Sequence, residues 1–466
     1  MFALFRQQST RWLLILATLE FTLLFACVYA ASHLRYVADA STLAELVGLL
    51  WLRALLFAGV IVAGMASMGL YQAHMRETWF GLIARQAVAF VLGGVVLVVF
   101  YYLFPQAYLG RGVFALSLVF GFVLVAVFRV GFMRFIDIES LKRRVLVLGA
   151  GRRAALIPQR LRRRSDRRGF VVVGFAPMGE DPVVVPEEMV LTREGSLREW
   201  AQRLQINEIV VGPDDRRGGL PMDELLECKQ AGMTVTDLAT FFERESGKIK
   251  LSLIDPSWLV FSGGFDSSPL RLVMKRVFDI GTALVVLALA WPFMLLVALA
   301  IRLESGKGAP ILYRQERVGE NGRVFALTKF RSMRTDAERD GVARWATRND
   351  DRVTRVGRII RKTRLDELPQ LMNVLKGEMS LVGPRPERPQ FVAELASKIR
   401  YYNLRHCVKP GLAGWAQLRY PYGASEEDAA EKLKYDLFYV KNHNFLLDFL
   451  IMIQTVEVVL FGRGAR

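Results

Sequence analysis

Four long apolar runs in the first third of the chain restrict its fold more than any other feature. They cover roughly residues 12–31, 46–71, 82–104 and 113–136. Each approaches or exceeds the ~20 residues that a helix needs to cross the hydrocarbon core of a membrane. No small-residue cleavage site follows the first run, and three more runs come after it, so a removable signal peptide is not expected. We therefore predict a four-helix transmembrane bundle over residues 1–140.

The charges around these runs are uneven. One side of the predicted membrane carries Arg6, Arg11, His74, Arg76, Arg85, Arg134, Lys142, Arg143 and Arg144. The loops on the other side carry only Arg35 and Arg111. Because cytoplasmic loops are enriched in Lys and Arg, we expect the N-terminus and everything after the fourth run to be cytoplasmic. Glu20 and Arg53 fall inside the first two runs, where we expect them to contribute to helix packing.

Composition limits the partners. With 52% hydrophobic residues and a mean hydropathy of +0.26, the chain is too apolar for an ordinary soluble enzyme. Its net charge of +17 suits anionic lipid or phosphorylated small molecules, and no nucleic acid partner is expected. The three cysteines and four histidines show neither CxxC nor HExxH spacing, so neither a disulfide framework nor a histidine metal centre is expected.

Strand and helix patterns alternate after the bundle and predict a Rossmann-like α/β domain over residues 141–240. The predicted strands are 144–148, 170–175, 208–212 and 233–238, and the clearest helices are 197–204 and 222–231. The first strand runs into the GAGRRA turn at 149–154, which resembles a dinucleotide-binding unit.

Two features argue against a working dinucleotide site. The second strand ends in Ala176-Pro177, without an acid for a ribose, and arginines crowd the first helix and its end. These arginines are Arg160, Arg162, Arg163, Arg164, Arg167 and Arg168. A folded spacer or regulatory domain is the better interpretation.

A connector rich in Gly, Ser and Pro covers residues 241–270, and an apolar run over 277–301 follows it. The run is long enough to cross a membrane. However, cations flank both ends, and Pro292 interrupts the hydrogen-bond ladder near its middle. A fifth crossing would also place the basic region beyond it outside the cell. We predict a re-entrant helix–break–helix hairpin at about 275–302; a fifth span kinked at the proline is the alternative.

The region from 271 to 466 contains the most informative residue patterns. Two strands joined by a glycine turn are predicted between 313 and 331, with Lys329 and Arg331 side by side. A glycine-punctuated loop is expected at 408–417. The final apolar run, 445–461, is interrupted by polar residues and suits the membrane interface.

The stretch 358–386 is the most informative. Leucines at helical spacing predict an amphipathic helix over about 363–376, ending at Gly377. Asp366 and Glu367 are adjacent acids among the cations Arg358, Arg361, Lys362 and Arg364, which favour ionised carboxylates and suit phosphate binding. Arg385 follows between Pro384 and Pro386, which limit where its guanidinium can point. This pattern indicates phosphoryl transfer, with an ordinary solvated helix face as the alternative.

Three segments, taken together, resemble the bacterial sugar transferases called monotopic phosphoglycosyl transferases. They read YRQERVGENGRVFALTKFRSM, RKTRLDELPQLMNVLKGEMSLVGPRPERP and RHCVKPGLAGWAQLRYPYG. The resemblance covers about residues 270–466. The bundle and α/β domain ahead of it are similar to the large, polyprenyl-phosphate hexose-1-phosphate transferase branch, which includes exopolysaccharide enzymes. The fold class implied is a transmembrane bundle, a Rossmann-like α/β domain and an α+β monotopic catalytic domain.

The resemblance implies a reaction and its partners. A UDP-sugar and a polyprenyl (undecaprenyl) phosphate would give a polyprenyl-diphosphate sugar and UMP, with Mg²⁺ as cofactor, at the bacterial inner membrane. This is an initiating step of surface glycan assembly. The sugar, the glycan and the oligomeric state stay open, a homodimer included.

The resemblance also assigns residues. Asp366 would be the nucleophile and Glu367 its partner, and the pair would hold the metal. Substrate phosphates would be bound by Lys329, Arg331, Arg361, Arg364, Pro384 and Arg385. Two positions depart from the family pattern. Trp291 stands where small members often have serine before the hairpin proline, and Ala413 replaces the usual threonine of the glycine loop.

Two other functions were weighed. A membrane-tethered, NAD-dependent nucleotide-sugar dehydratase or epimerase would use the GAGRRA loop. Such enzymes generally need a tyrosine with a lysine four residues later, and no tyrosine in the chain has one. A non-catalytic scaffold for polysaccharide assembly is the other alternative.

Overall fold

The protein divides into two compact units, residues 1–246 and 247–466. The structure is a computed structural model, and it describes residues 8–36, 40–71, 79–135, 142–161, 167, 169–178, 182–215, 219–265, 268–306, 308–337, 350–420, 423 and 425–460. Each unit is considered by itself.

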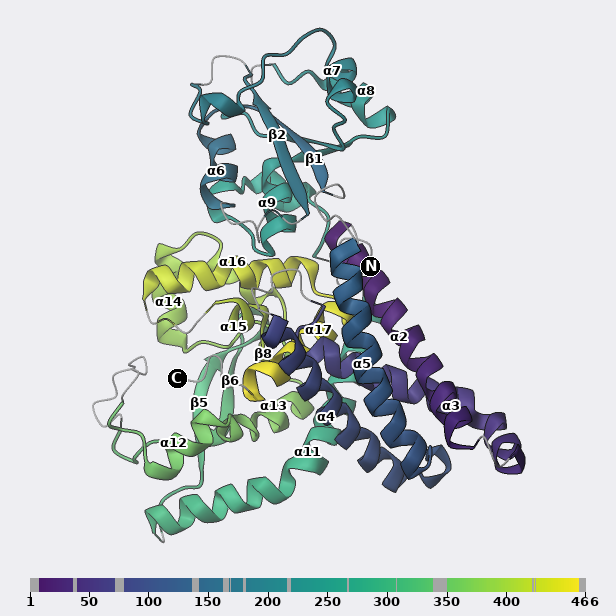
Figure 1. The fold of residues 1–466 in the computed structure, drawn as a ribbon. Helices are drawn as coiled ribbons and strands as arrows, with labels where there is room; N and C mark the ends of the chain where they lie inside the picture. The colour runs from purple at the N-terminus through teal and green to yellow at the C-terminus, as the bar shows by residue number, and fades with distance from the viewer. Residues whose placement is uncertain are drawn as a thin grey trace. The chain divides into compact units, whose positions relative to one another are not determined.

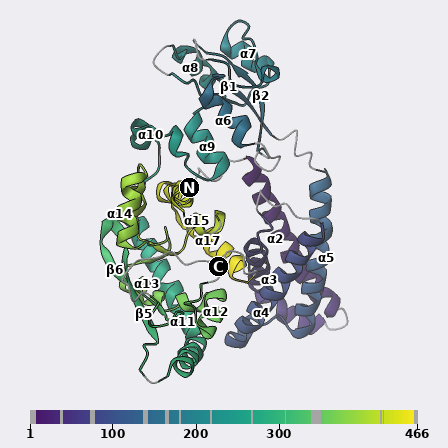
Figure 2. The ribbon, with the colours of Figure 1, turned by 90° about the vertical axis from the view of Figure 1, so that its left-hand side faces the viewer.

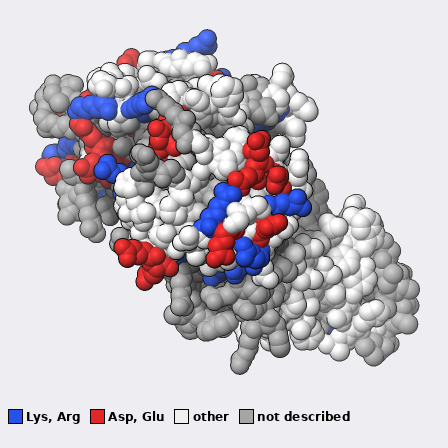
Figure 3. All heavy atoms as spheres, turned by 90° about the horizontal axis from the view of Figure 1, so that it is seen from above, with Lys and Arg blue, Asp and Glu red and all other residues white. Residues whose placement is uncertain are grey.

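The first unit begins with the four predicted membrane helices, which the structure confirms as helices (Figure 1). They are α2 (Gln8–Arg35), α3 (Ala40–Ser67), α4 (Trp79–Leu103) and α5 (Arg111–Phe135), with a short 3-10 turn η1 (Pro105–Ala107) between α4 and α5. All four are long and apolar enough to cross a membrane, judged by length and composition. Their shared core contains Leu24, Phe57, Ile61 and Met65. Toward the right of Figure 3, where α2 and α3 lie, the surface carries almost no charge.

A buried ion pair joins the first and last of these helices. Glu20 of α2 is fully buried, and its two carboxylate oxygens accept hydrogen bonds from Arg129 of α5 at 2.8 and 2.6 Å. The hydroxyl of Tyr71 donates to the same carboxylate at 2.5 Å. Arg53 instead donates to the backbone carbonyl of Gln106 at 3.0 Å. Glu20 therefore has the helix-packing role that its position predicts, with Arg129 as its partner.

Several basic positions used to predict the orientation lie outside the described residues. These are Arg6, His74 and Arg76, and the same holds for Arg162, Arg163, Arg164 and Arg168 of the α/β domain.

The α/β domain has a four-stranded sheet in which every neighbouring pair is parallel, in the order β2-β1-β3-β4. Its elements are β1 (Arg143–Leu148), α6 (Arg152–Arg160), β2 (Phe170–Ala176), η2 (Glu187–Met189), α7 (Leu197–Arg203), β3 (Glu208–Val211), α8 (Met222–Gln230), β4 (Thr234–Asp237) and α9 (Leu238–Ser246). The four predicted strands are thus confirmed. Their buried faces pack on α7 and α8 around Leu146, Trp200 and Ile209.

The second unit starts with a segment that packs against the rest of it. This segment contains η3 (Leu251–Leu253) and α10 (Pro256–Phe261). The backbone N–H of Ile249 donates to Lys434, and that of Phe265 donates to Lys441, both at 2.9 Å. The part of the predicted connector from 247 to 265 is therefore folded onto helix α16 (Glu426–Asn442) of the same unit.

The apolar run after it is one continuous helix, α11 (Pro269–Ser305), of 37 residues with Pro292 inside. The predicted break into two helices is wrong. A proline removes one hydrogen bond and bends a helix, and here the turns on both sides keep the helix intact. Figure 1 shows a single ribbon whose direction changes along its length. The helix is long and apolar enough to cross a membrane, and most of its apolar side chains are exposed within the unit.

The first half of α11 is fixed to the rest of the second unit by polar contacts. The Lys275 ammonium contacts the carboxylate of Asp448 at 2.6 Å and the Tyr439 hydroxyl at 3.3 Å. Asp279 accepts a hydrogen bond from the backbone N–H of Leu381 at 3.1 Å. Farther along, Ile301 packs in a small core with Phe330 and Ile360. The long helix and these elements therefore belong to one packed unit.

The remaining elements of the second unit include an antiparallel hairpin (Figure 2). They are β5 (Leu312–Val318), η4 (Glu320–Gly322), β6 (Val324–Phe330), α12 (Arg355–Lys362), η5 (Leu365–Glu367), α13 (Gln370–Lys376), β7 (Ser380–Val382), α14 (Pro389–Lys398), η6 (Tyr402–Cys407), β8 (Gly411–Ala413), α15 (Trp415–Arg419), α16 and α17 (Phe445–Leu460). The predicted hairpin is confirmed as β5–β6, and β7 pairs in parallel with β8.

The predicted continuous helix over 363–376 is wrong. Helix α12 ends at Lys362, and Arg364 adopts a left-handed conformation with φ 59°. A 3-10 turn then carries the acidic pair before α13 starts, and Gly377 ends α13 at φ 87° as predicted. A left-handed non-glycine residue is unfavourable by itself, so the surrounding packing must impose this reversal.

The Glu20–Arg129 pair gives a test of the bundle. Removing one partner leaves a buried charge uncompensated, which costs about 3–5 kcal/mol. We expect Glu20→Leu to lower the melting temperature of the detergent-solubilised protein markedly. The double variant Glu20→Leu/Arg129→Leu should recover most of that loss, because two apolar side chains replace the pair. A double variant as unstable as the single one would contradict a pairwise role.

Candidate functional site

The adjacent acids occupy a turn that separates their environments. The turn η5 follows the left-handed residue Arg364, so Asp366 and Glu367 are not on one regular helix face. Asp366 is 8% exposed, and the Glu367 side chain is 13% exposed. Two largely buried, adjacent carboxylates need cations or protons nearby, since burial disfavours the charged form.

Glu367 receives the direct ion pairs. Its Oε1 atom lies 2.8 Å from Nη2 of Arg385 and 3.3 Å from Nη1 of Arg364. Burial alone would raise the pKa of this carboxyl. The charges of Arg385 and Arg364 outweigh that effect and hold the pKa of Glu367 well below its usual range. Glu367 is therefore ionised throughout the physiological range, and its Oε1 atom is engaged by two guanidiniums.

Asp366 behaves differently. Burial, and next the charge of Glu367, raise its pKa to about 6, although Lys329, Arg361 and Arg385 each lower it. The prediction that cations such as Arg364 hold Asp366 ionised is corrected here, because the ion pair of Arg364 goes to Glu367. Asp366 is still mostly ionised at neutral pH, but it is a more basic carboxylate than an exposed aspartate, as a nucleophile or base should be.

Lys329 reaches this pair from the hairpin. It lies near the end of β6, with its ammonium 5.4 Å from the ring centroid of Tyr313 on the paired strand. Burial, and then the charge of Arg317, lower the pKa of Lys329 to about 8. Asn373 of α13 fixes the hairpin here, since its side chain accepts from the N–H of Thr328 and donates to the carbonyl of Ala326. With this lowered pKa, Lys329 can lose its positive charge just above neutral pH, and its charge acts on both acids.

The structure groups most, but not all, of the predicted site residues. Lys329, Arg361, Arg364 and Arg385 all act on the acidic pair. Arg331 does not belong to this group. It is 6% exposed, and the charge that acts on it is that of Glu304, at the end of α11. Its role in substrate binding stays a prediction.

The loop containing Pro384 and Arg385 is held against the glycine-punctuated loop. The N–H of Gly411 donates to the carbonyl of Pro384 at 2.9 Å. A Cβ atom on Gly411 would lie 2.0 Å from the backbone nitrogen of Gly383, so only glycine allows this approach. The two loops recognised separately in the sequence therefore form one structure.

Two arginines, the part-buried Arg317 and the buried Arg405, were not predicted for the site. Arg317 donates to the carbonyl of Pro386, and Arg405 to that of Arg385, both at 2.9 Å. Both stand inside the segments that carry the family resemblance. Their position in those segments could have marked them as candidate site residues. The sequence alone, however, did not show which groups they contact.

The carboxylates of the site can supply some, but not all, of the ligands that Mg²⁺ needs. No group of three acidic, histidine or cysteine side chains able to hold a metal occurs in the described part of the chain. Mg²⁺, however, is commonly bound by one or two carboxylates together with substrate phosphates. Asp366 and Glu367 provide two carboxylates, which is enough for that mode when a diphosphate is present.

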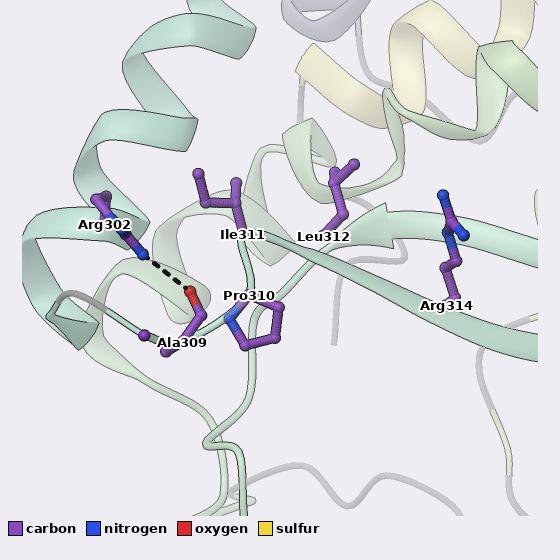
Figure 4. Close-up of a pocket in the computed structure, with 7 residues that line it drawn as sticks. Arg302, Ala309, Pro310, Ile311, Leu312 and Arg314 are labelled. Atoms are coloured by element: carbon purple, nitrogen blue, oxygen red, sulfur yellow. Dashed lines mark hydrogen bonds between the residues drawn. The ribbon is translucent and has the colours of Figure 1, made fainter.

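A separate open pocket lies where α11 meets β5 (Figure 4). It is lined by Arg302, Gly308, Ala309, Pro310, Ile311, Leu312 and Arg314. None of these residues belongs to the acidic site. Arg314 is exposed and alternates along β5 with Tyr313, which faces Lys329. The pocket is therefore a surface feature on another side of the hairpin.

The glycine turn of the α/β domain is occupied by the chain itself. Both carboxylate oxygens of Asp214 accept hydrogen bonds at the start of α6, from the N–H groups of Arg152 at 2.8 Å and Arg153 at 2.7 Å. In dinucleotide-binding domains, the helix start after this turn receives the pyrophosphate. Here an internal carboxylate takes that place, which supports the interpretation that the turn is not a dinucleotide site.

Comparison with known proteins agrees with this geometry. Residues 270–462 match the family model described as bacterial sugar transferase. The chain is 42% identical over 242 residues to a UDP-N-acetylgalactosamine-undecaprenyl-phosphate N-acetylgalactosaminephosphotransferase of Aeromonas hydrophila, covering 52% of this chain and 56% of that protein. It is 34% identical over 333 residues to an undecaprenyl-phosphate glucose phosphotransferase of Komagataeibacter xylinus, covering 70% of this chain and 61% of that one.

The chain thus spans a little over half the length of these two curated relatives. A shorter relative is covered almost entirely. The exopolysaccharide production protein PSS of Rhizobium leguminosarum bv. phaseoli is 42% identical over 203 residues, which make up 41% of this chain and 98% of that protein. Since the acidic turn and the loops around it lie within the matched region, the chain belongs to the bacterial sugar transferase family.

Proposed function

We propose that the protein transfers a sugar 1-phosphate from a UDP-sugar to a polyprenyl phosphate, such as undecaprenyl phosphate, and releases UMP. The observation that carries this proposal is the asymmetric acidic pair. Asp366 is buried, basic for an aspartate and surrounded by cations, whereas Glu367 is engaged by Arg364 and Arg385. The names of the relatives, which include a UDP-glucose:undecaprenyl-phosphate glucose-1-phosphate transferase of Klebsiella pneumoniae, support the same reaction. Such transfer would initiate the assembly of a surface polysaccharide.

The reaction proceeds in two displacements. A carboxylate oxygen of Asp366 attacks the phosphorus that bears the sugar, and the bond from that phosphorus to the UMP oxygen breaks. UMP leaves with the electron pair, and a phosphosugar-aspartate ester remains. An oxygen of the polyprenyl phosphate then attacks the same phosphorus, the ester bond breaks, and the Asp366 carboxylate is regenerated. Lys329, Arg361 and Arg385 stabilise the phosphate charges in both steps.

Mg²⁺ is part of the proposal. Asp366 and Glu367, with the diphosphate of the donor, would hold it. When bound, it would neutralise charge that develops on the departing UMP.

The membrane arrangement is also proposed. The second unit would lie on the cytoplasmic face of the bacterial inner membrane, with α11, a single helix whose direction changes along its length, dipping into the lipid and returning to the same side. Lys275 and Arg276 at one end and Arg302 at the other support this, because all three are cations and because α11 forms one core with the catalytic elements. The acceptor phosphate could then reach Asp366 while its chain stays in the bilayer.

The nucleophile gives the first test. We expect Asp366→Asn to abolish UMP release from a UDP-sugar, because an amide cannot form the phosphoester. The measurement is UMP production by purified protein with a panel of UDP-sugars and polyprenyl phosphate. Asp350→Asn is a matched control, since Asp350 pairs with Arg352 at 2.6 Å outside the acidic turn, and it should keep most of its turnover. Substantial turnover by Asp366→Asn would rule out a nucleophilic role.

The pKa values predict a bell-shaped pH profile. As pH falls through about 6, Asp366 becomes protonated and turnover is lost. As pH rises through about 8, Lys329 loses its charge and turnover falls again. Lys329→Arg keeps a cation at all accessible pH values, so its alkaline limb should disappear even though its maximal rate is lower. An unchanged alkaline limb in Lys329→Arg would show that another group titrates there.

Cys407 provides a topology test without an introduced label. It is an exposed cysteine of the second unit, whereas Cys27 and Cys228 are buried. A membrane-impermeant maleimide should label the protein in inside-out vesicles but not in intact spheroplasts, and Cys407→Ser should remove the signal. Labelling in intact spheroplasts would mean that α11 crosses the membrane and would contradict the proposed arrangement.

A further inference from the structure

Four consecutive backbone carbonyls beside the acidic pair are each held by a different donor. The carbonyl of Pro384 accepts from Gly411 N–H, that of Arg385 from Arg405, that of Pro386 from Arg317, and that of Glu387 from Val318 N–H, each at 2.9 Å. These donors come from β5, η6 and β8. A loop without regular structure is thus fixed at every residue, as expected where a side chain must be held in position.

Arg405 is the most constrained of the donors. It is 5% exposed, and its Nε and Nη2 atoms lie 3.1 and 2.7 Å from one oxygen of Asp436, which is itself 2% exposed on α16. Its Nη1 atom lies 3.0 Å from the hydroxyl of Tyr402. The guanidinium is therefore oriented on three sides, and Nη2 is also directed at the carbonyl of Arg385.

Arg385 needs such support because its own side chain is loosely packed. The side chain is 40% exposed, yet it makes the 2.8 Å contact with Glu367. An exposed arginine has many rotamers, and holding it in one geometry is entropically costly. Fixing its backbone between two prolines reduces the positions that its guanidinium can reach.

We propose that Arg405, oriented by Asp436, is a positioning residue that fixes the backbone of Arg385 and so keeps the Arg385 guanidinium on the acidic pair. The expected effect on turnover rests on the proposed phosphosugar transfer. The expected effect on the loop structure does not. Arg405 itself need not touch either substrate.

The kinetic test uses Arg405→Lys. A lysine keeps the charge opposite Asp436, so folding should be retained, but a single ammonium cannot reproduce the planar fork that serves both Asp436 and the loop carbonyl. Misplacement of Arg385 should reduce turnover on the order of 10²-fold.

A merely structural role would lower the amount of folded protein and leave the turnover per folded molecule near that of the parent. A double-mutant cycle with Arg385→Gln sharpens this distinction. If Arg405 acts through Arg385, the double variant should be no slower than Arg385→Gln alone. Losses that multiply would overturn the proposal, as would parent-like turnover in folded Arg405→Lys. Arg419→Lys is the matched control, since Arg419 is a part-buried arginine that stacks on Trp415, and its turnover should stay near that of the parent.

Hydrogen–deuterium exchange gives a readout independent of activity. In Arg405→Lys, the amides of Gly411 and Val318, which donate to the loop carbonyls, should exchange at least about tenfold faster than in the parent, because the loop opens locally. Peptides of α16 should be unchanged, as should the loop in Arg419→Lys. If the parent releases no UMP from any UDP-sugar, the proposed function fails. The exchange of the loop alone then decides whether Arg405 positions it. An unchanged exchange rate in Arg405→Lys would overturn the positioning role.

Discussion

The site depends on an unequal division of charge between two adjacent carboxylates. Glu367 takes the direct contacts of Arg364 and Arg385, and so remains ionised despite its burial. The ionised form of Asp366 is destabilised in turn, because burial and the neighbouring negative charge of Glu367 both raise its pKa. Adjacent acids in similar surroundings would titrate as a pair without distinct roles. Here the environment separates them, and the more basic and less committed carboxylate is the one suited to attack phosphorus.

This division is maintained by elements far apart in the chain. The acidic turn is placed by a reversal at Arg364, and its cations come from the hairpin, from α12 and from the loop at Arg385. The same body includes α11, through the contact of Lys275 with Asp448 and the core around Ile301. The long apolar helix and the acidic turn are therefore parts of one packed unit. On the proposed function, this packing holds the nucleophile at a fixed depth relative to the lipid acceptor.

The sequence predicted the elements better than their interruptions. Apolar periodicity was enough for the four helices, the parallel sheet and the hairpin, because each depends on local pattern. It missed the left-handed turn at Arg364, which tertiary packing imposes, and it placed a helix break at Pro292, where the structure has a continuous helix. The cluster of site residues was largely predicted. Which cation pairs with which acid was not, because the Arg385 contact spans 18 residues of chain.

In the α/β domain, a local sequence motif suggests a function that a residue distant in the sequence makes unnecessary. Its glycine turn has the local form of a nucleotide site, since a strand leads through Gly149 at φ +116° into α6. What decides its use is a residue more than sixty positions later. Asp214 presents a carboxylate to the first N–H groups of α6, satisfying donors that would otherwise need a phosphate. A Cβ on Gly151 would approach that carboxylate at 2.4 Å, so glycine here serves an internal contact. The glycine motif is thus explained by folding, without a bound nucleotide.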